Sequence, residues 1–478
     1  MSDHLIFHKS RLGKIGVILP KCDVPDTPLE DIFESEEIRA VPANLPEVTE
    51  PDVVRHYTNL SSKNHHVDKD VYPLGSCTMK YNPKVNDLMA GLPGLSSIHP
   101  AQPEETVQGA LAIMAGLEDQ LKAITGMGRF TLQPAAGSQG ELVGVLIMQA
   151  YHAKKGSQRK YILIPDTAHG TNPASVVMAG FDVIQVKSDQ RGRVDLDDLR
   201  EKLSTEVAGM MLTQPNTLGL FETDIREIIQ LVHSVDGLMY MDGANLNAMV
   251  GLARPGKFGA DVSHLNLHKT FCIPHGGGGP GVGPVAVREH LAPYLPNHSM
   301  DPTAGPTTGV GAISAAPFGS AGILPISWAY ITLMGAEGLR RATEAAIVSA
   351  NYLATRLGRR FPILYVGANG RVAHECILDT RVLKASYITA EDICKRLIDY
   401  GFHAPTVSFP VPGTIMVEPT ESENLAELDR FCEALIAIRG EIQAVIDGTA
   451  DAEDNVLKNA PHTAAEATAA VYREVLGR

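Results

Sequence analysis

Residues 263–271 read SHLNLHKTF, and residues 276–281, shortly after them, read GGGGPG. Lys269 therefore lies between a largely apolar run and a loop too rich in glycine to be regular structure. A lysine amine becomes a nucleophile only when desolvation or a neighbouring cation lowers its pKa, which is about 10.4 in water. The local sequence makes Lys269 a candidate Schiff-base lysine, and the glycines let backbone approach a flat cofactor or another subunit closely.

Two other interpretations of this segment fit less well. The glycines also match the dinucleotide fingerprint G-x-G-x-x-G, but that motif opens a helix, whereas residues 282–287 read VGPVAV and are typical of a strand. A metal site would use His264, His268, Cys272 and His275. That set contains no carboxylate, and histidines four residues apart share a face only on a helix, which this β-like segment does not predict.

The composition indicates a soluble α/β protein of two or three domains. Hydrophobic residues make up 44% of the 478 residues and aromatic residues 5%. The balance of 41 basic and 55 acidic residues gives a net charge of −14, which argues against nucleic acid as a partner. The six cysteines lack C-x-x-C spacing, and the sequence shows neither a basic leader nor a long apolar run. We therefore expect free thiols in a cytoplasmic protein without a membrane span.

Patterning along the chain predicts an extended arm followed by two α/β domains. Residues 1–100 are rich in proline and charge with little apolar periodicity, which is typical of an arm that covers a neighbouring subunit. In residues 101–330, apolar runs alternate with helical patterns, and this alternation predicts a mostly parallel sheet flanked by helices, the large cofactor-binding domain. Residues 331–478 predict a smaller α/β domain on a long helix. In such a sheet, ligands lie at the carboxyl ends of the strands.

The individual elements follow from the spacing of the apolar residues. The predicted helices are 104–125, 196–203, 225–235, 326–357, 390–400 and 424–446. The predicted strands are 161–164, 183–186, 209–212, 238–241, 282–287, 363–366 and 376–378.

Asp242 directly follows the predicted strand 238–241 and precedes Lys269 by 27 residues. A carboxylate at a strand end, with a lysine one strand later, is the arrangement of fold type I pyridoxal-phosphate enzymes. The carboxylate keeps the pyridine nitrogen protonated, and the pyridinium then accepts the electron pair left by bond cleavage. Alone, Asp242 is more simply a turn or cap residue. Its pairing with Lys269 favours the cofactor role.

Two further motifs lie where strands should end. His169, in DTAHGTNPAS (166–175), either stacks on a cofactor ring or caps the helix that follows. The stretch AAGSQGE (135–141) precedes a helix that ends near residue 154. Its small residues expose backbone N–H groups at a helix N-terminus, which suits the cofactor phosphate.

Five segments, above all 263–281, resemble the glycine dehydrogenase (decarboxylating) family, the P-protein of the glycine cleavage system. The other four are 72–83, 132–137, 168–175 and 240–248. Some family members are a single chain about twice as long, and this sequence resembles their second half, the separate β subunit (subunit 2) of other members. The resemblance thus implies a homologous α subunit (subunit 1) in an α2β2 heterotetramer, and the lipoylated H-protein as a further partner.

For the site, the resemblance implies pyridoxal 5′-phosphate bound to Lys269 as an internal aldimine, with Asp242 at the pyridinium nitrogen. His169 would stack on one face of the ring, opposite Ala244. The further implied contacts are Gly137 and Ser138 at the phosphate with His268 nearby, and Asn216 and Thr217 at the ring hydroxyl.

The implied activity is that of glycine dehydrogenase (aminomethyl-transferring), an oxidoreductase acting on the CH–NH2 group with a disulfide acceptor, in glycine catabolism. Glycine would lose its carboxylate as CO2, and the remaining carbanion would attack the lipoyl disulfide of the H-protein. No metal and no cysteine of this chain is required. Two alternatives stay open: another fold type I enzyme, such as an aminotransferase, lyase or desulfurase, and a non-catalytic scaffold subunit, against which Lys269 argues.

Overall fold

The computed structural model describes residues 5–99, 101–276, 279–463 and 465–466. The chain divides into two compact units, residues 1–66 and residues 67–478. The domain boundaries predicted near residues 100 and 330 stay predictions.

The first unit contains little regular structure and little core. Its elements are the 3-10 helices η1 (Ile6–Lys9) and η2 (Leu29–Asp31) and helix α1 (Glu50–Ser61). Thr49 caps α1: its hydroxyl accepts a hydrogen bond from the backbone N–H of Asp52, and the Asp52 carboxylate accepts one from the Thr49 N–H. Large apolar side chains stay exposed, among them Leu12, Ile15, Val17, Ile18 and Leu19.

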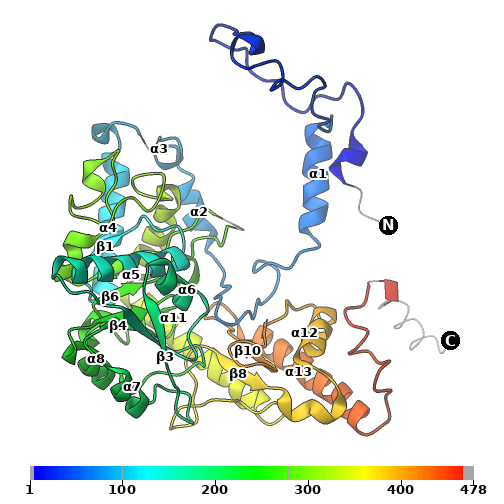
Figure 1. The fold of residues 1–478 in the computed structure, drawn as a ribbon. Helices are drawn as coiled ribbons and strands as arrows, with labels where there is room; N and C mark the ends of the chain where they lie inside the picture. The colour runs from blue at the N-terminus through cyan, green and yellow to red at the C-terminus, as the bar shows by residue number, and fades with distance from the viewer. Residues whose placement is uncertain (1–4, 100, 277–278, 464, 467–478) are drawn as a thin grey trace. The chain divides into compact units, whose positions relative to one another are not determined.

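A seven-stranded sheet forms the centre of the second unit, in the order β1-β7-β6-β5-β4-β2-β3 (Figure 1). Its strands are β1 (Arg129–Thr131), β2 (Tyr161–Pro165), β3 (Asp182–Val186), β4 (Val207–Thr213), β5 (Leu238–Asp242), β6 (Val262–His264) and β7 (Val285–Val287). Strands β3, β2, β4, β5 and β6 are parallel in turn, whereas β7 runs antiparallel to both β6 and β1. The predicted mostly parallel sheet is therefore confirmed.

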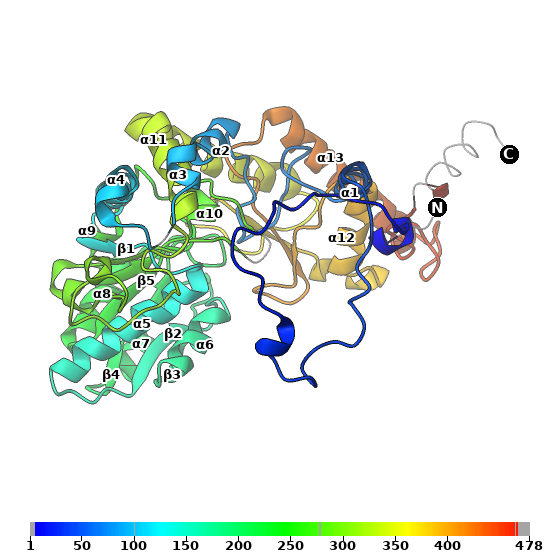
Figure 2. The ribbon, with the colours of Figure 1, turned by 90° about the horizontal axis from the view of Figure 1, so that it is seen from above.

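Helices cover both faces of this sheet because its central strands are apolar on both sides. On β5, Tyr240 packs with residues of α5, and its neighbour Met239 packs with residues of α8 on the opposite face. Helices α2 and α4 pack on the long helix α11 (Figure 2). The α-helices of this part are α2 (Lys84–Ala90), α3 (Pro93–Ser96), α4 (Gln108–Thr125), α5 (Gly137–Lys154), α6 (Thr171–Met178), α7 (Leu196–Lys202), α8 (Ile225–Ser234), α9 (Pro255–Phe258), α10 (Leu267–Thr270) and α11 (Leu324–Leu357). The 3-10 helices are η3 (Glu104–Thr106), η4 (Glu289–Tyr294), η5 (Pro302–Ala304) and η6 (Ala321–Ile323).

A second, antiparallel sheet in the order β8-β10-β9 organises the C-terminal part of the second unit. Its elements are β8 (Cys376–Asp379), η7 (Arg381–Ser386), α12 (Ala390–Asp399), β9 (Thr406–Val407), β10 (Thr414–Val417) and α13 (Leu425–Ile446). Phe361, Phe431 and Leu435 are buried in its core together with side chains of α11. Leu74 forms a bridge with Val417, so residues near 74 pack on this sheet.

The bounds of the predicted helices are confirmed to within a few residues, but α11 is interrupted at Gly335, whose φ of 61° is not helical, and three further local predictions were wrong. Residues 363–366 do not form a strand, and only Ile363 makes a bridge, to Leu378. Strands β1, β9 and β10 were missed because they are short, and a segment rich in proline and glycine separates β9 from β10. Residues 267–270 are helical, not β-like, and the chain leaves them through Cys272 at φ 66°. In the part of the chain that the structure describes, no helix is long and apolar enough to cross a membrane.

Two glycines inside helices offer a matched test of the packing of α5 on the sheet. A Cβ at Gly144 would overlap the Tyr240 ring, whereas a Cβ at Gly440 in α13 would meet nothing within 4 Å. We expect Gly144→Ala to lower the free energy of unfolding by about 1–3 kcal/mol through overpacking. Gly440→Ala should raise it by about 0.5–1 kcal/mol, because alanine loses less backbone entropy on folding. Urea unfolding of both variants checks this. Equal changes in the free energy of unfolding would contradict the close packing of α5 against the Tyr240 ring.

Candidate functional site

Asp242 and Lys269 follow neighbouring parallel strands on the same edge of the sheet. Asp242 is the last residue of β5, and Lys269 lies in the short helix α10 that follows β6. The Lys269 side chain is half-buried, and no described residue forms a hydrogen bond or ion pair with its amine. Burial, and next the charge of that amine, lower the pKa of His169, and the same charge is one of several causes that lower the pKa of Asp242. The structure thus brings these three predicted site residues together.

The Asp242 carboxylate is 2% exposed and is surrounded by donors. Its oxygens accept hydrogen bonds from the Ala244 N–H at 2.9 Å, and from Asn172 Nδ2 and Thr213 Oγ1 at 3.2 Å each. Burial alone would raise the pKa of Asp242, but its neighbours, led by His264, hold the pKa below its usual value. Asp242 is therefore a charged carboxylate at neutral pH in an almost dry environment.

A second buried carboxylate, Glu141 of α5, lies behind Asp242. Burial, and next the charge of Asp242, raise the pKa of Glu141 to about 8. Between them lies the fully buried His264, whose Nε2 is 3.5 Å from Asp242 Oδ1 and 4.0 Å from Glu141 Oε1. Its Nδ1 is 2.7 Å from the Tyr240 hydroxyl. The environment thus separates the two carboxyl groups into one charged and one neutral at pH 7.

The N-terminus of α5 lies at the segment where the sequence predicts an anion seat, and that seat stays a prediction. Ala136, the N-cap residue, has no side chain that can cap the helix, and the first turn contains no acidic residue. Backbone N–H groups at this position lack partners within the helix. A Cβ at Gly137 would overlap the Asn266 side chain, whose buried Oδ1 has no hydrogen-bond partner among the described residues. Gly137 thus allows the start of α5 to pack closely against Asn266, and Ser138 beside it is exposed.

His169, Ala244 and Thr217 border the same region. His169 is exposed, its Nδ1 is 2.8 Å from Thr171 Oγ1, and its ring lies edge-on to Phe409. Ala244 accepts a hydrogen bond from the Asn266 N–H. The Thr217 hydroxyl donates to the carbonyl of Thr167, two residues before His169.

Asn216 and His268 have surroundings that the sequence did not indicate. The Asn216 amide donates to Gly192 O and Glu222 Oε1, and its Oδ1 accepts from two backbone N–H groups of its own loop. All four hydrogen-bonding positions are filled, so a contact with a ring hydroxyl would require these bonds to change. Burial, then the neighbouring His275, lower the pKa of His268 to about 3, so this ring is neutral. The predicted cofactor contacts of both residues stay predictions.

The glycine-rich segment approaches the backbone of this same chain, and its predicted approach to a cofactor or another subunit stays a prediction. A Cβ at Gly281 would overlap the carbonyl of Ala135, and one at Gly283 would overlap the carbonyl of Ala136, at the start of α5. Gly276 and Gly279 have positive φ angles of 71° and 122°. Gly277 and Gly278 lie outside the described residues.

A buried acidic cluster from the C-terminal part was not predicted. Glu418 accepts hydrogen bonds from the N–H and hydroxyl of Thr78 and from Asn245 Nδ2. Burial, then the charge of Glu418, raise the pKa of Glu375 to about 8, whereas the charge of Lys269 lowers it. Both ring nitrogens of the buried His374 lack hydrogen-bond partners among the described residues. No motif marks these residues, because they meet the site only through the tertiary fold.

Comparison with known proteins identifies the family. The family model described as glycine cleavage system P-protein matches residues 26–300, and that of the C-terminal domain of glycine dehydrogenase matches residues 342–462. The chain belongs to the P-protein family. Glycine dehydrogenase (decarboxylating) from Bordetella avium (strain 197N) is 57% identical over 426 residues, which are 87% of this chain and 44% of the relative. The protein of the same name from Paraburkholderia phytofirmans is 55% identical over 435 residues, 90% of this chain and 44% of the relative.

This chain thus spans less than half the length of the P-protein relatives it matches. Among solved structures, glycine decarboxylase (P-protein) of the glycine cleavage system, in inhibitor-bound form, superposes with a TM-score of 0.72 at 20% identity, over 86% of this chain and 95% of that chain. The cysteine desulfurase CsdA from Escherichia coli gives a TM-score of 0.61 at 14% identity, over 78% of this chain and 96% of that one. These likenesses concern the fold alone, and they confirm the predicted mostly parallel α/β sheet flanked by helices.

The raised pKa of Glu141 predicts a pH dependence of stability. Because the folded state holds the Glu141 proton up to about pH 8 and the unfolded state releases it near 4.5, stability should fall as pH rises through this window. Glu141→Gln should flatten that fall by up to about 1.4 kcal/mol per pH unit. Urea unfolding at pH 5 to 9 measures how the free energy of unfolding changes with pH in each variant. The exposed Glu337→Gln is the control, and an unchanged slope in Glu141→Gln would contradict the assignment.

Proposed function

We propose that this chain binds pyridoxal 5′-phosphate at Lys269 and catalyses the decarboxylation of glycine, with transfer of the aminomethyl group to the lipoyl group of an H-protein. One observation carries the proposal: an amine without partners among the described residues and a charged, buried carboxylate follow adjacent parallel strands, in a chain of the P-protein family. A scaffold subunit would need neither group.

The residues of the site fit the cofactor. Lys269 would hold it covalently, and the N-terminus of α5, where Gly137 packs against Asn266, would hold the phosphate. Asp242 would face the pyridine nitrogen, and His169 would lie against the ring opposite Ala244. When bound, the cofactor supplies the electron sink for the pair left by the departing carboxylate.

The role of Asp242 is to keep a proton on that nitrogen, which it can do only while it is charged. The hydrogen bonds from Asn172, Thr213 and the Ala244 N–H stabilise the charged carboxylate. The raised pKa of Glu141 keeps the second carboxyl neutral, so the buried region holds one negative charge, not two. Low solvent exposure of Asp242 strengthens its interaction with a cation, since the local dielectric is low.

We further propose that the chain is the β subunit (subunit 2) of an α2β2 assembly with a homologous α subunit, and that it works in the cytoplasm. The P-protein relatives contain a region that this chain does not match. The exposed apolar side chains of residues 1–66 are suited to burial by another chain. All six cysteines are free, which fits a reducing compartment.

Removal of the Lys269 amine should abolish catalysis with little effect on the fold. Lys269→Ala should lose the visible absorbance of the lysine-bound cofactor and the exchange of labelled bicarbonate into glycine, because no other amine takes its place. Asp242→Asn is the matched variant: it should keep the covalent cofactor yet lose activity by roughly 10²-fold or more, since an amide cannot hold the nitrogen protonated. Exchange of more than a few per cent in Lys269→Ala would rule out the lysine assignment.

The assembly proposal predicts that the chain gains activity only with its partner. Light scattering and glycine–bicarbonate exchange should be measured on the purified chain with and without a candidate α subunit from the same host. We expect an increase in mass to that of a heterotetramer, together with the appearance of activity. A monomer of this chain that is fully active without a partner would contradict the proposal.

A further inference from the structure

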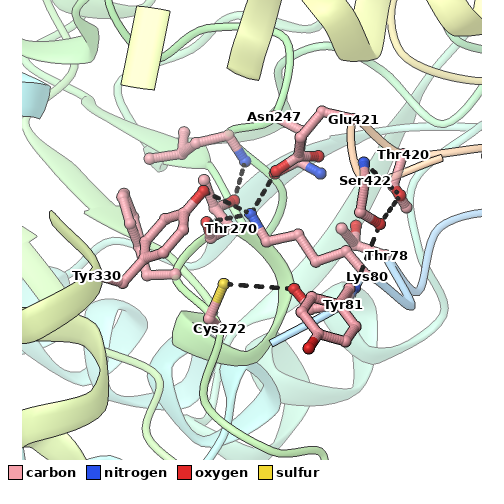
Figure 3. Close-up of polar contacts among 12 residues, drawn as sticks. Thr78, Lys80, Tyr81, Asn247, Thr270, Cys272, Tyr330, Thr420, Glu421 and Ser422 are labelled. Atoms are coloured by element: carbon pink, nitrogen blue, oxygen red, sulfur yellow. Dashed lines mark hydrogen bonds and ion pairs between the residues drawn. The ribbon is translucent and has the colours of Figure 1, made fainter. Parts of the chain in front are cut away.

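Lys80 lies deep in the second unit, next to the residues that carry Lys269. Its side chain is 3% exposed. Its Nζ donates hydrogen bonds to the Thr270 carbonyl at 2.7 Å and to Glu421 Oε1 at 2.5 Å, and lies 3.4 Å from the Tyr330 hydroxyl (Figure 3). Burial alone would lower the pKa of Lys80, but the charge of Glu421 raises it above its usual value. Lys80 is therefore charged throughout the physiological range.

The carbonyl that Lys80 binds belongs to the residue that follows Lys269. Thr270 is the last residue of α10, so its carbonyl accepts no hydrogen bond within the helix. A cation at this C-terminal end also complements the helix dipole. A helix of four residues has no cooperative stability of its own. The conformation of α10 must therefore be set by contacts from outside it.

Two neutral contacts accompany the Lys80 contact. The Leu246 N–H donates to Thr270 Oγ1 at 3.0 Å, and Ser327 Oγ donates to the Phe271 carbonyl at 2.8 Å. The chain then turns through Cys272 in the left-handed region, a conformation costly for a residue with a side chain. Such a turn persists only where the surroundings fix it, and Lys80 makes the one charged contact among these three.

The ion pair itself is a weak reason for Lys80 to be buried. Desolvation of two charges offsets most of their attraction, and apolar pairs of similar size are often as stable. The unpartnered Glu421 Oε2 shows that the pair is not fully satisfied among the described residues. An apolar side chain, however, would leave the Thr270 carbonyl without its donor.

We propose that Lys80 is a positioning residue: its ammonium holds the Thr270 peptide group and so fixes where the Lys269 side chain leaves the backbone. Lys80 is fixed by its hydrogen bonds, and it holds the backbone next to Lys269, whose amine has no partner among the described residues. The link to cofactor binding rests on the proposed function, whereas the effect on the α10 backbone does not.

Three variants and a control separate positioning from stability. Lys80→Met leaves Glu421 buried without a counter-charge. This variant should therefore unfold at a lower urea concentration, and the backbone of its α10 should be more mobile. The double variant Lys80→Met/Glu421→Met removes both charges and should recover most of the unfolding midpoint, because no lone buried charge remains. Lys80→Arg keeps the charge and should fold, but its larger head cannot keep the same contact. Lys84→Met removes the exposed lysine paired with Asp68 and is the matched control.

The first readout needs no cofactor. Hydrogen–deuterium exchange of the peptide spanning residues 266–272 should be roughly tenfold faster or more in both Lys80→Met variants, since a backbone hydrogen-bond contact of about 1.4 kcal/mol is lost. Lys84→Met should exchange as the wild type does. A double variant that folds and keeps wild-type exchange in this peptide would overturn the proposal.

The second readout is the covalent link. Each protein is titrated with pyridoxal 5′-phosphate and reduced with borohydride, and the modified fraction of Lys269 is measured by peptide mass spectrometry. The double variant should need roughly tenfold more cofactor for half modification of Lys269, because the free-energy loss is the same as the one that speeds up hydrogen exchange. Normal modification there would also overturn the proposal. If the wild-type protein is not modified at all, the proposed function fails, while the exchange readout still decides the role of Lys80.

Discussion

The site depends on one buried carboxylate that stays charged. Asp242 lies at the end of β5, where water cannot stabilise its charge, and burial alone would neutralise it. The structure meets this cost with directed donors from three segments: α6 through Asn172, β4 through Thr213, and the loop after β5 through the Ala244 N–H. Each donor is placed by the ends of parallel strands or by the helix that follows one. The charged state of the Asp242 carboxylate thus depends on the parallel sheet, because the sheet places the donors that stabilise it.

Keeping Asp242 charged has a consequence for its neighbours. A second negative charge in the same low-dielectric region would raise the energy of both, and the structure avoids it by holding a proton on Glu141. Burial lowers the pKa of the His264 between the two carboxyls, whereas the charge of Asp242 raises it. The result is a single well-defined charge that faces the Lys269 side of the sheet. Such separation of neighbouring titratable groups is a common property of catalytic sites.

Much of this arrangement could be predicted from sequence, because it is local. Asp242 follows the predicted strand 238–241, the small residues around Gly137 precede a helix, and Lys269 was expected one strand after Asp242, so these residues were expected at one sheet edge. The supporting residues could not be found this way. Lys80 and Glu421 are 341 positions apart, and Thr78 meets Glu418 across 340. Lys80 belongs to segment 72–83, which carries part of the family resemblance, but nothing in that segment indicates that Lys80 is buried while Lys84 is exposed.

The short helix α10 was misjudged for a related reason. Four residues carry too little periodicity to indicate a helix, and the apolar run before them is typical of a strand, as β6 confirms. What makes residues 267–270 helical is the set of external contacts to Thr270 and Phe271 from three distant segments. Helicity here is imposed by the tertiary structure and not by propensity. Lys269, the proposed site of the covalent cofactor, thus lies on an element too short to hold its own shape, next to contacts from residues to which the proposed reaction gives no role.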